Sequence, residues 1–181
     1  MFDVIFKNVV LQISDYSFTI FALAVLLTSL VILSIGIMVL FREKASRESV
    51  LFFLIILAVF FWLFPSSFMY VSPNEERALW WYRFAYLAGV PYIATAIFQF
   101  TIFVLRTYPS QQRKAWVSWI LSCFFAIWAL VSDSIISGVK LHPWGYFPCY
   151  GWASIPFLAF FIYIMFSSLL QYYQKSREEI S

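Results

Sequence analysis

Long uncharged stretches separate the charged residues along this chain. Five windows contain no Asp, Glu, Lys or Arg, and they hold 26, 26, 22, 18 and 34 residues. A helix needs about 20 apolar residues to cross a hydrocarbon core about 30 Å thick. The pattern therefore predicts five membrane-spanning helices, over residues 18–41, 49–68, 79–105, 115–136 and 153–173.

Residues typical of helix starts and interruptions support these bounds. Pro65 is expected to kink or end the second helix, and Gly89 and Pro91 to interrupt the third, because proline removes a backbone hydrogen bond. Pro156 falls in the first turn of the fifth helix, where a missing amide proton is tolerated. Expected N-caps and first-turn acids are Ser14, Asp15 or Ser17 for the first helix, Ser46 for the second, and Glu75 and Glu76 for the third.

The first sixteen residues differ from the spans that follow. Apolar side chains recur there at helical spacing with polar ones opposite: Phe2, Ile5, Phe6, Val9, Val10 and Ile13 against Asp3, Lys7, Asn8 and Gln12. Residues 1–16 are therefore interpreted as an amphipathic segment in the membrane interface. A frayed terminus is the alternative, because isolated helices this short are marginal. Residues 17–174 then form the membrane domain and residues 175–181 a cytoplasmic tail.

Basic residues are more numerous in every second connection between the spans. Eight lie on one side: Arg42, Lys44, Arg47, Arg106, Arg113, Lys114, Lys175 and Arg177. Four lie on the other: Lys7, Arg77, Arg83 and Lys140. Because cytoplasmic connections are enriched in Lys and Arg, the N-terminus is predicted outside and the C-terminus inside. An odd number of spans is consistent with this orientation.

Composition excludes several classes of protein. The chain has 181 residues, of which 63% are hydrophobic and 12% charged, against about 45–50% and about 25% in soluble domains. A soluble monomer and a disordered chain are excluded, and two cysteines are too few for a disulfide-stapled module. Cys123 and Cys149 are predicted at different depths, so no disulfide is expected between them. The sequence indicates an all-α, multi-pass membrane protein that is embedded in the lipid bilayer.

Most catalytic constellations lack their residues. His142 is the single histidine, so a bis-histidine haem, a HExxH zinc site and a histidine-based triad each lack a partner. The sequence has no GxSxG elbow or glycine-rich phosphate loop. We therefore expect no enzymatic activity, no cofactor and no metal site in this chain. The net charge of +3 gives no indication of nucleic-acid binding.

Two charged residues near the outer ends of the third and fourth spans are candidates for sensing. Asp133 is predicted about four residues before the fourth span ends, and Arg83 near the outer end of the third is its expected partner. A charge at that depth requires a partner or a wet cavity. Either the pair responds to a ligand or signal, or both side chains extend to the interface and anchor their helices.

Polar and small residues of the third span have two interpretations. Gln99 lies one helical turn after Thr95, and Gly89 and Pro91 lie further out on the same helix. An amide within hydrocarbon usually bonds to a neighbouring helix, which favours helix–helix adhesion. Alternatively, Pro91 is a hinge and Gln99 moves with the part of the helix below it.

Residues 137–152 form the most unusual segment. It contains three glycines, two prolines and four Trp or Tyr residues, so it is predicted to be a shaped loop and not a span. Its side chains either line a pocket or hold the loop at headgroup level. Candidate sensing residues are Lys140, His142, Trp144 and Tyr146, and candidate packing residues are Gly145 and Gly151.

Three groups of residues carry a resemblance to a known family. They are Trp144-Gly145-Tyr146 with Gly151; the series Trp81, Arg83, Gly89, Pro91, Phe98 and Arg106; and Ser132-Asp133 with Ile135, Ile136, Ser137 and Gly138. These resemble the amino-terminal seven-helix membrane region of bacterial histidine kinases and diguanylate cyclases. In that family two more helices and a cytoplasmic output domain would follow, whereas this chain has five spans and no kinase or cyclase motif.

The resemblance implies a sensory or signal-coupling module in the bacterial inner membrane, without a catalytic output domain of its own. It would act with a cytoplasmic kinase or cyclase, with other membrane subunits or as a homodimer. The alternative is a non-catalytic accessory or structural subunit of a larger membrane complex. A small transporter is disfavoured, because neither internal repeats nor several intramembrane polar sites are evident.

Overall fold

The computed structural model describes residues 11–13 and 16–180. The chain is mostly helical (78%), and the described part contains five helices long and apolar enough to cross a membrane. This confirms the predicted number of spans. The helical segments are α2 (Ile20–Arg42), α3 (Arg47–Tyr70), α4 (Glu75–Ala88), α5 (Val90–Val104), α6 (Tyr108–Val131) and α7 (Ser154–Ile180), with α4 and α5 together forming the third span.

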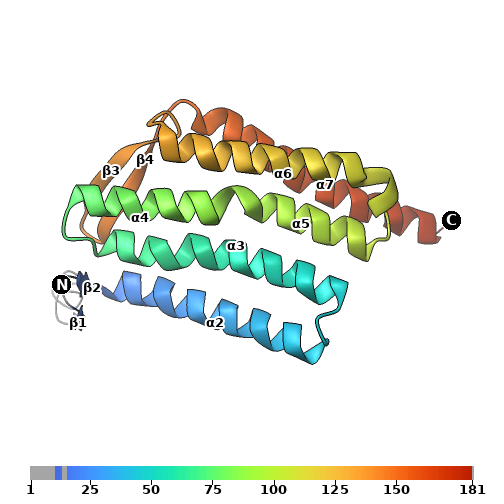
Figure 1. The fold of residues 1–181 in the computed structure, drawn as a ribbon, viewed down its shortest axis with the longest axis horizontal. Coiled ribbons are helices and arrows are strands. Elements are labelled where there is room, and N and C mark those ends of the chain that lie inside the picture. The colour runs from blue at the N-terminus through green and yellow to red at the C-terminus, as the bar shows by residue number, and fades with distance from the viewer. Residues whose placement is uncertain (1–10, 14–15, 181) are drawn as a thin grey trace.

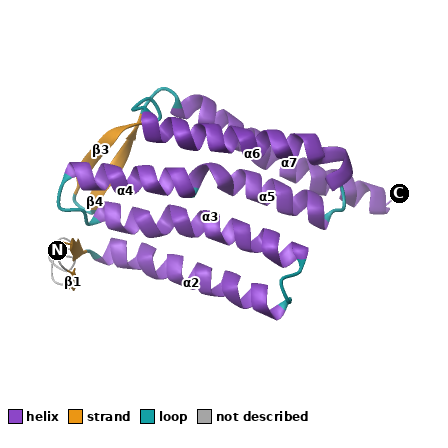
Figure 2. Cartoon of the chain, viewed as in Figure 1, coloured by secondary structure: helices purple, strands orange, loops and turns teal. Residues whose placement is uncertain are grey.

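The long helices run along the long axis of the molecule, with two β-hairpins at one end (Figures 1 and 2). The hairpins are β1 (Leu11–Ile13) with β2 (Tyr16–Phe18), and β3 (Ile136–His142) with β4 (Gly145–Tyr150). We call this the hairpin end. The opposite end holds the α2–α3 and α5–α6 connections and the end of α7, and therefore all eight basic residues of the more basic side. We call it the basic end.

The third span lies at the centre of the bundle. Its two halves pack against α3 on one side and against α6 and α7 on the other, while α2 packs against α3 at the edge (Figure 1). Tyr86, Phe98 and Ile102 on this span are almost fully buried. The apolar core is thus built around α4 and α5, whereas the outward faces of α2, α6 and α7 expose large apolar side chains suited to lipid.

Small residues allow α2 to approach α3 closely. Ala22, Ser29 and Gly36 are the buried residues of α2, and they recur every seven positions. A β-carbon added to Gly36 would lie 2.6 Å from Cγ2 of Ile56 on α3. Interfaces between membrane helices are enriched in such residues because hydrocarbon offers no hydrophobic driving force for association. The packing of α2 against α3 therefore depends on the close fit of their two surfaces.

Gly89 divides the third span at a point where two backbones meet. It has φ −126° and ψ −71°, outside helical geometry, and it separates α4 from α5. A β-carbon there would lie 2.5 Å from the amide nitrogen of Trp62 and 2.6 Å from the carbonyl oxygen of Ala58. The predicted interruption is confirmed. The structure assigns Gly89 to packing directly against α3.

Several helix starts follow from side-chain caps. Ser46 accepts a hydrogen bond from the Ser49 amide at the start of α3, as predicted. Asn74 accepts one from Arg77, and Glu75 and Glu76 occupy the first turn of α4, where carboxylates oppose the helix dipole.

Three details of the helix bounds differ from the prediction. Thr19 caps α2 in place of the residues expected before it. Pro65 does not end α3, which was one of the two outcomes expected there; the helix continues to Tyr70. Helix α6 ends at Val131, five residues early, because Ser132 adopts an extended conformation with φ −143° and ψ 143° and the chain enters β3.

The predicted loop and the N-terminal segment also differ from expectation. Residues 137–151 are mostly strand, so the fold is not purely α-helical. The interfacial helix predicted over residues 1–16 falls largely outside the described residues. At its end, Leu11–Ile13 is a strand paired with Tyr16–Phe18 and not the last turn of a helix.

Candidate functional site

The β3–β4 hairpin is the structure that organises the hairpin end. Its strands pair antiparallel from Ile136↔Tyr150 at the base to His142↔Gly145 at the tip, with an irregularity at Ser137. Short two-stranded hairpins are marginal in isolation, so this one requires tertiary packing. The packing is provided by α3 and α4, which both contact the hairpin.

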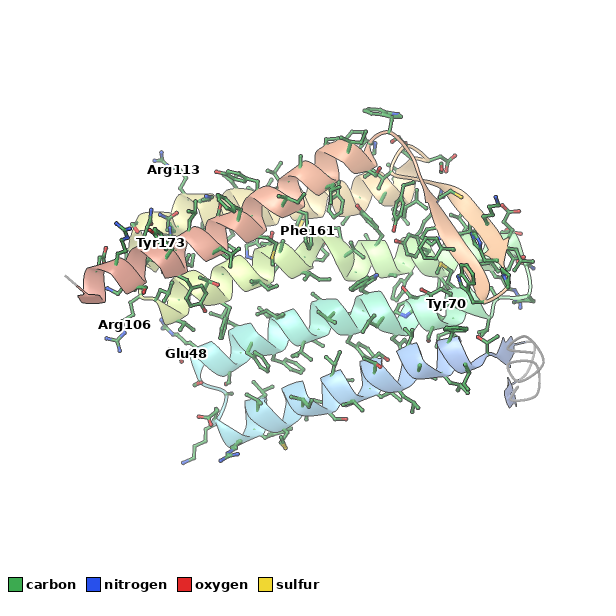
Figure 3. The ribbon with its side chains drawn as sticks, turned by 180° about the vertical axis from the view of Figure 1, so that it is seen from behind. Glu48, Tyr70, Arg106, Arg113, Phe161 and Tyr173 are labelled. Atoms are coloured by element: carbon green, nitrogen blue, oxygen red, sulfur yellow. The ribbon has the colours of Figure 1, made fainter. Side chains whose placement is uncertain are left out.

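Two glycines fix the hairpin at its ends. Gly145 has φ +127°, and a β-carbon there would lie 2.8 Å from the carbonyl carbon of Tyr70, the last residue of α3. Gly151 lies against Ser134, whose carbonyl carbon would be 2.7 Å from an added β-carbon. Figure 3 shows Tyr70 beside the hairpin. Both glycines predicted to serve packing are therefore placed where only a backbone without a side chain fits.

A third attachment is a tyrosine pair. The hydroxyls of Tyr82 on α4 and Tyr150 on β4 lie 2.7 Å apart and are hydrogen-bonded. Tyr82 is 5% exposed, whereas Tyr150 reaches the surface. This bond holds the base of β4 against α4, the first half of the third span.

Beside this pair is an apolar pocket of about 360 Å³, which we call the tyrosine pocket. It is bounded by α3, α4, the first residue of α5, β4 and α7. Its wall is mostly apolar, with three tyrosines and one serine. The lining residues are Trp62, Tyr82, Tyr86, Val90, Tyr150, Ser154, Ile155, Phe157 and Leu158.

Tyr86 has an unsatisfied polar group in this wall. The residue is 2% exposed, and its hydroxyl has no hydrogen-bond partner among the described residues. Its ring packs against Phe157 of α7, with centroids 5.1 Å apart. A buried hydroxyl without a partner costs about 1–3 kcal/mol, so such a group usually marks a place where a water or ligand completes the hydrogen bond.

The ion pair expected from the sequence is present. A guanidinium nitrogen of Arg83 on α4 contacts a carboxylate oxygen of Asp133. Asp133 lies in the turn after α6 and not within the last turns of that helix, because α6 ends at Val131. The pair joins α4 to the segment that leads into β3.

Removing the charge of Asp133 is expected to have a small effect. The side chain of Asp133 is 77% exposed and that of Arg83 is 23% exposed, and exposed pairs contribute about 0–1 kcal/mol. Asp133→Asn should therefore lower the free energy of unfolding in detergent by less than about 1 kcal/mol. A loss of several kcal/mol would show instead that Asp133 is essential to the fold.

The remaining candidates on the hairpin lie at its tip. His142 stacks on Trp144 with centroids 4.9 Å apart, and Phe147 meets the His142 ring edge-on. Lys140 is exposed, and Tyr146 packs against the core. The tip lies beside Tyr70, whereas Arg83 and Asp133 lie at the base of the hairpin. The structure therefore separates the predicted sensing residues into two groups.

Gln99 and its neighbours on α5 bind α6. The Gln99 side-chain carbonyl accepts a hydrogen bond from the Trp119 indole. The hydroxyls of Thr95 and Ser122 lie 2.8 Å apart, and Ser122 donates to the Pro91 carbonyl at 2.7 Å. Helix–helix adhesion, one of the two interpretations of Gln99, is the one that these contacts favour.

The tyrosine pocket was not predicted from the sequence. Tyr82 and Tyr86 belong to an aromatic cluster typical of residues at headgroup level, yet both are buried inside the bundle. The available signal was helical spacing: the buried positions of α4 are Ala78, Tyr82, Ala85 and Tyr86, which recur at i, i+4, i+7 and i+8.

Comparisons with known proteins identify no relative of this chain. No protein-family model, curated protein or solved structure matches the chain. Within the described residues, no three His, Cys, Asp or Glu side chains come together as a metal site requires, and Cys123 and Cys149 are both free.

Proposed function

We propose that this chain is a membrane sensory and signal-coupling module without a catalytic output domain, and that its ligand site is the tyrosine pocket. The observation that carries the proposal is the unpartnered hydroxyl of Tyr86 in the wall of a 360 Å³ apolar pocket. Pockets that bind small molecules are mostly apolar with a few placed polar groups. A lipid-soluble molecule with one hydrogen-bonding group fits this description.

The pocket is connected to the basic end by two helices. Tyr86 lies on α4, which continues beyond Gly89 as α5, and Phe157 lies on α7. Helices α5 and α7 pack against each other, and α7 extends past the other helices at the basic end (Figure 1). A ligand that alters the spacing of α4 and α7 would therefore move the end of α7, provided it binds two arrangements with different affinity.

The basic residues also favour one orientation of the bundle in the membrane. Eight basic residues lie at the basic end, which favours that end in the cytoplasm and the hairpins outside. The location that accompanies this proposal is the bacterial inner membrane, and the partner is a cytoplasmic kinase or cyclase beyond the end of α7.

A separate observation supports a second candidate function. Helix α2 packs along α3 at the edge of the bundle and exposes large apolar side chains along its length, including Leu27, Val31 and Met38. Such a face suits either lipid or another membrane subunit. An accessory role in a larger complex, or a homodimer, would use this surface, and purification in a mild detergent would then recover a stoichiometric partner or a second copy.

Phenylalanine at position 86 provides the test of the pocket. In detergent-purified, ligand-free protein, Tyr86→Phe should raise the free energy of unfolding by about 1 kcal/mol, because it removes a buried hydroxyl that has no partner. Tyr82→Phe should lower it, because Tyr150 then loses its hydrogen-bond partner. Equal destabilisation by both variants would show that the Tyr86 hydroxyl is already satisfied within the protein.

A reporter fusion tests the signalling function. With a kinase or cyclase domain joined after Ser181, Tyr86→Phe should change the basal output of cells whose membranes supply the ligand. Leu141→Ala is the control and should leave the output unchanged, because Leu141 on β3 is 65% exposed and does not line the tyrosine pocket. An output that no pocket variant alters would overturn the sensory proposal and favour the accessory role.

A further inference from the structure

A second groove lies at the basic end, between α6 and α7. Its volume is about 380 Å³, and it is lined by α6 and α7 residues alone. Both helices pack on α5, and the groove lies between them on the surface of the bundle. We call it the basic groove. Its lining residues are Ser110, Arg113, Lys114, Val117, Ser118, Leu121, Phe160, Tyr163 and Ile164.

The charges of this groove are positive and are not neutralised by the protein. Neither Arg113 nor Lys114 forms an ion pair within the described part of the chain. The Lys114 ammonium donates to the Ser167 hydroxyl at 2.7 Å, and it lies 4.6 Å from the ring centroid of Tyr163. These neutral partners orient the ammonium without cancelling its charge. Figure 3 shows Arg113 at the basic end, projecting outward from its helix.

Polarity changes along the groove in one direction. Ser110, Arg113 and Lys114 lie in the first two turns of α6, whereas Val117 and Leu121 follow deeper along the same helix. From Ser110 to Leu121 the helix rises about 16 Å, which matches about half of a 30 Å hydrocarbon core. The groove is therefore cationic at headgroup level and apolar over the depth of one leaflet.

We propose that the basic groove binds one anionic phospholipid from the leaflet at the basic end. Its phosphate would contact Arg113 and Lys114, and one acyl chain would lie along Val117, Leu121 and Phe160. Basic pockets between membrane helices bind lipid phosphates through this combination of charge and apolar contact. This site is at the opposite end of the bundle from the tyrosine pocket, so the inference does not rest on the proposed sensory function.

Native mass spectrometry of the full chain in detergent tests the proposal. The probes are phosphatidylglycerol and phosphatidylcholine with the same acyl chains, and glycerol 3-phosphate as the soluble headgroup. The wild-type protein should retain one phosphatidylglycerol at least tenfold more strongly than phosphatidylcholine. Glycerol 3-phosphate at the same concentration should not displace it. Equal retention of the two lipids, or displacement by glycerol 3-phosphate, would overturn the proposal.

Two kinds of variant distinguish the contribution of the positive charges to lipid binding from that of the apolar part of the groove. Arg113→Gln with Lys114→Gln should weaken phosphatidylglycerol binding at least tenfold, whereas Arg42→Gln, at the same end on α2, should not. Leu121→Trp should weaken it without changing a charge, because the indole fills the path of the acyl chain. Ile120→Trp is the matched control, since Ile120 is 64% exposed and does not line the groove.

The controls also distinguish specific from general attraction. If Arg42→Gln weakens binding as much as the change at Arg113 and Lys114, the lipid is held by the total charge of the basic end and the proposal fails. If Leu121→Trp and Ile120→Trp behave alike, the groove does not hold the chain and the proposal fails. Circular dichroism and size-exclusion profiles should show that all variants keep their helices.

Discussion

Gly89→Ala should lower the free energy of unfolding by about 2–3 kcal/mol, a large effect for one methyl group. The added β-carbon would lie 2.5 Å from the Trp62 amide nitrogen and 2.6 Å from the Ala58 carbonyl oxygen, both backbone atoms of α3. Backbone cannot rotate away as a side chain can, so α4 and α3 would have to separate. Alanine normally favours a helix interior by about 1 kcal/mol over glycine, but Gly89 is outside helical geometry.

Denaturant titration in mixed micelles, followed by circular dichroism, measures this loss. Gly138→Ala is the control, because no heavy atom lies within 4 Å of the added β-carbon, and it should change stability by no more than about 0.5 kcal/mol. Gly36→Ala should fall between the two, since it meets the Ile56 side chain and not backbone. A Gly89→Ala protein as stable as the Gly138→Ala protein would refute the close approach of α4 and α3.

Gly145→Ala should release the hairpin tip from α3. The position combines φ +127°, which strongly disfavours residues with a β-carbon, with direct contact to the backbone of Tyr70. Strain of this kind costs about 1–3 kcal/mol, and 1.4 kcal/mol corresponds to about a tenfold change in an opening equilibrium. The hairpin should therefore open about tenfold more often than in the wild-type protein.

Labelling of Cys149 by a membrane-impermeant maleimide reports that opening. Cys149 lies on β4 and is half-buried, and Cys123 is removed as Cys123→Ser so that one thiol remains. The labelling rate should rise about tenfold in Gly145→Ala and stay unchanged in Trp144→Phe, which alters the neighbouring exposed residue. An unchanged rate in Gly145→Ala would mean that the contact with Tyr70 does not hold the hairpin closed.

The membrane spans could be predicted from sequence because their physical requirement is simple. A window without charge and long enough for the hydrocarbon core predicts a helix whatever its neighbours are. The interruption at Gly89 was also evident, since glycine and proline stand close together in one apolar window. Helix ends were not predictable in this way: α6 ends at Val131 because Ser132 is extended, and hydropathy does not indicate that change of backbone geometry.

The hairpin and the tyrosine pocket could not be predicted in the same way. Two short strands with many glycines and aromatic residues resemble a loop in composition, and they pair here because α3 and α4 support them. The Tyr86 side chain enters the bundle because its face of α4 packs against α7, and hydropathy alone does not predict which face of a helix packs against which neighbour. The pairing of Arg83 with Asp133 was predictable because few charges lie near the predicted outer ends of the spans.

The length of α7 determines where a domain fused to its end would lie. Its 27 residues extend about 40 Å, against about 30 Å of hydrocarbon. With α7 across a bilayer, about two turns would extend beyond the hydrocarbon core, and a domain joined to them would be held at a distance from the lipid surface. Each residue inserted at this junction would turn that domain by about 100° around the helix axis, so its angular phase would depend on linker length.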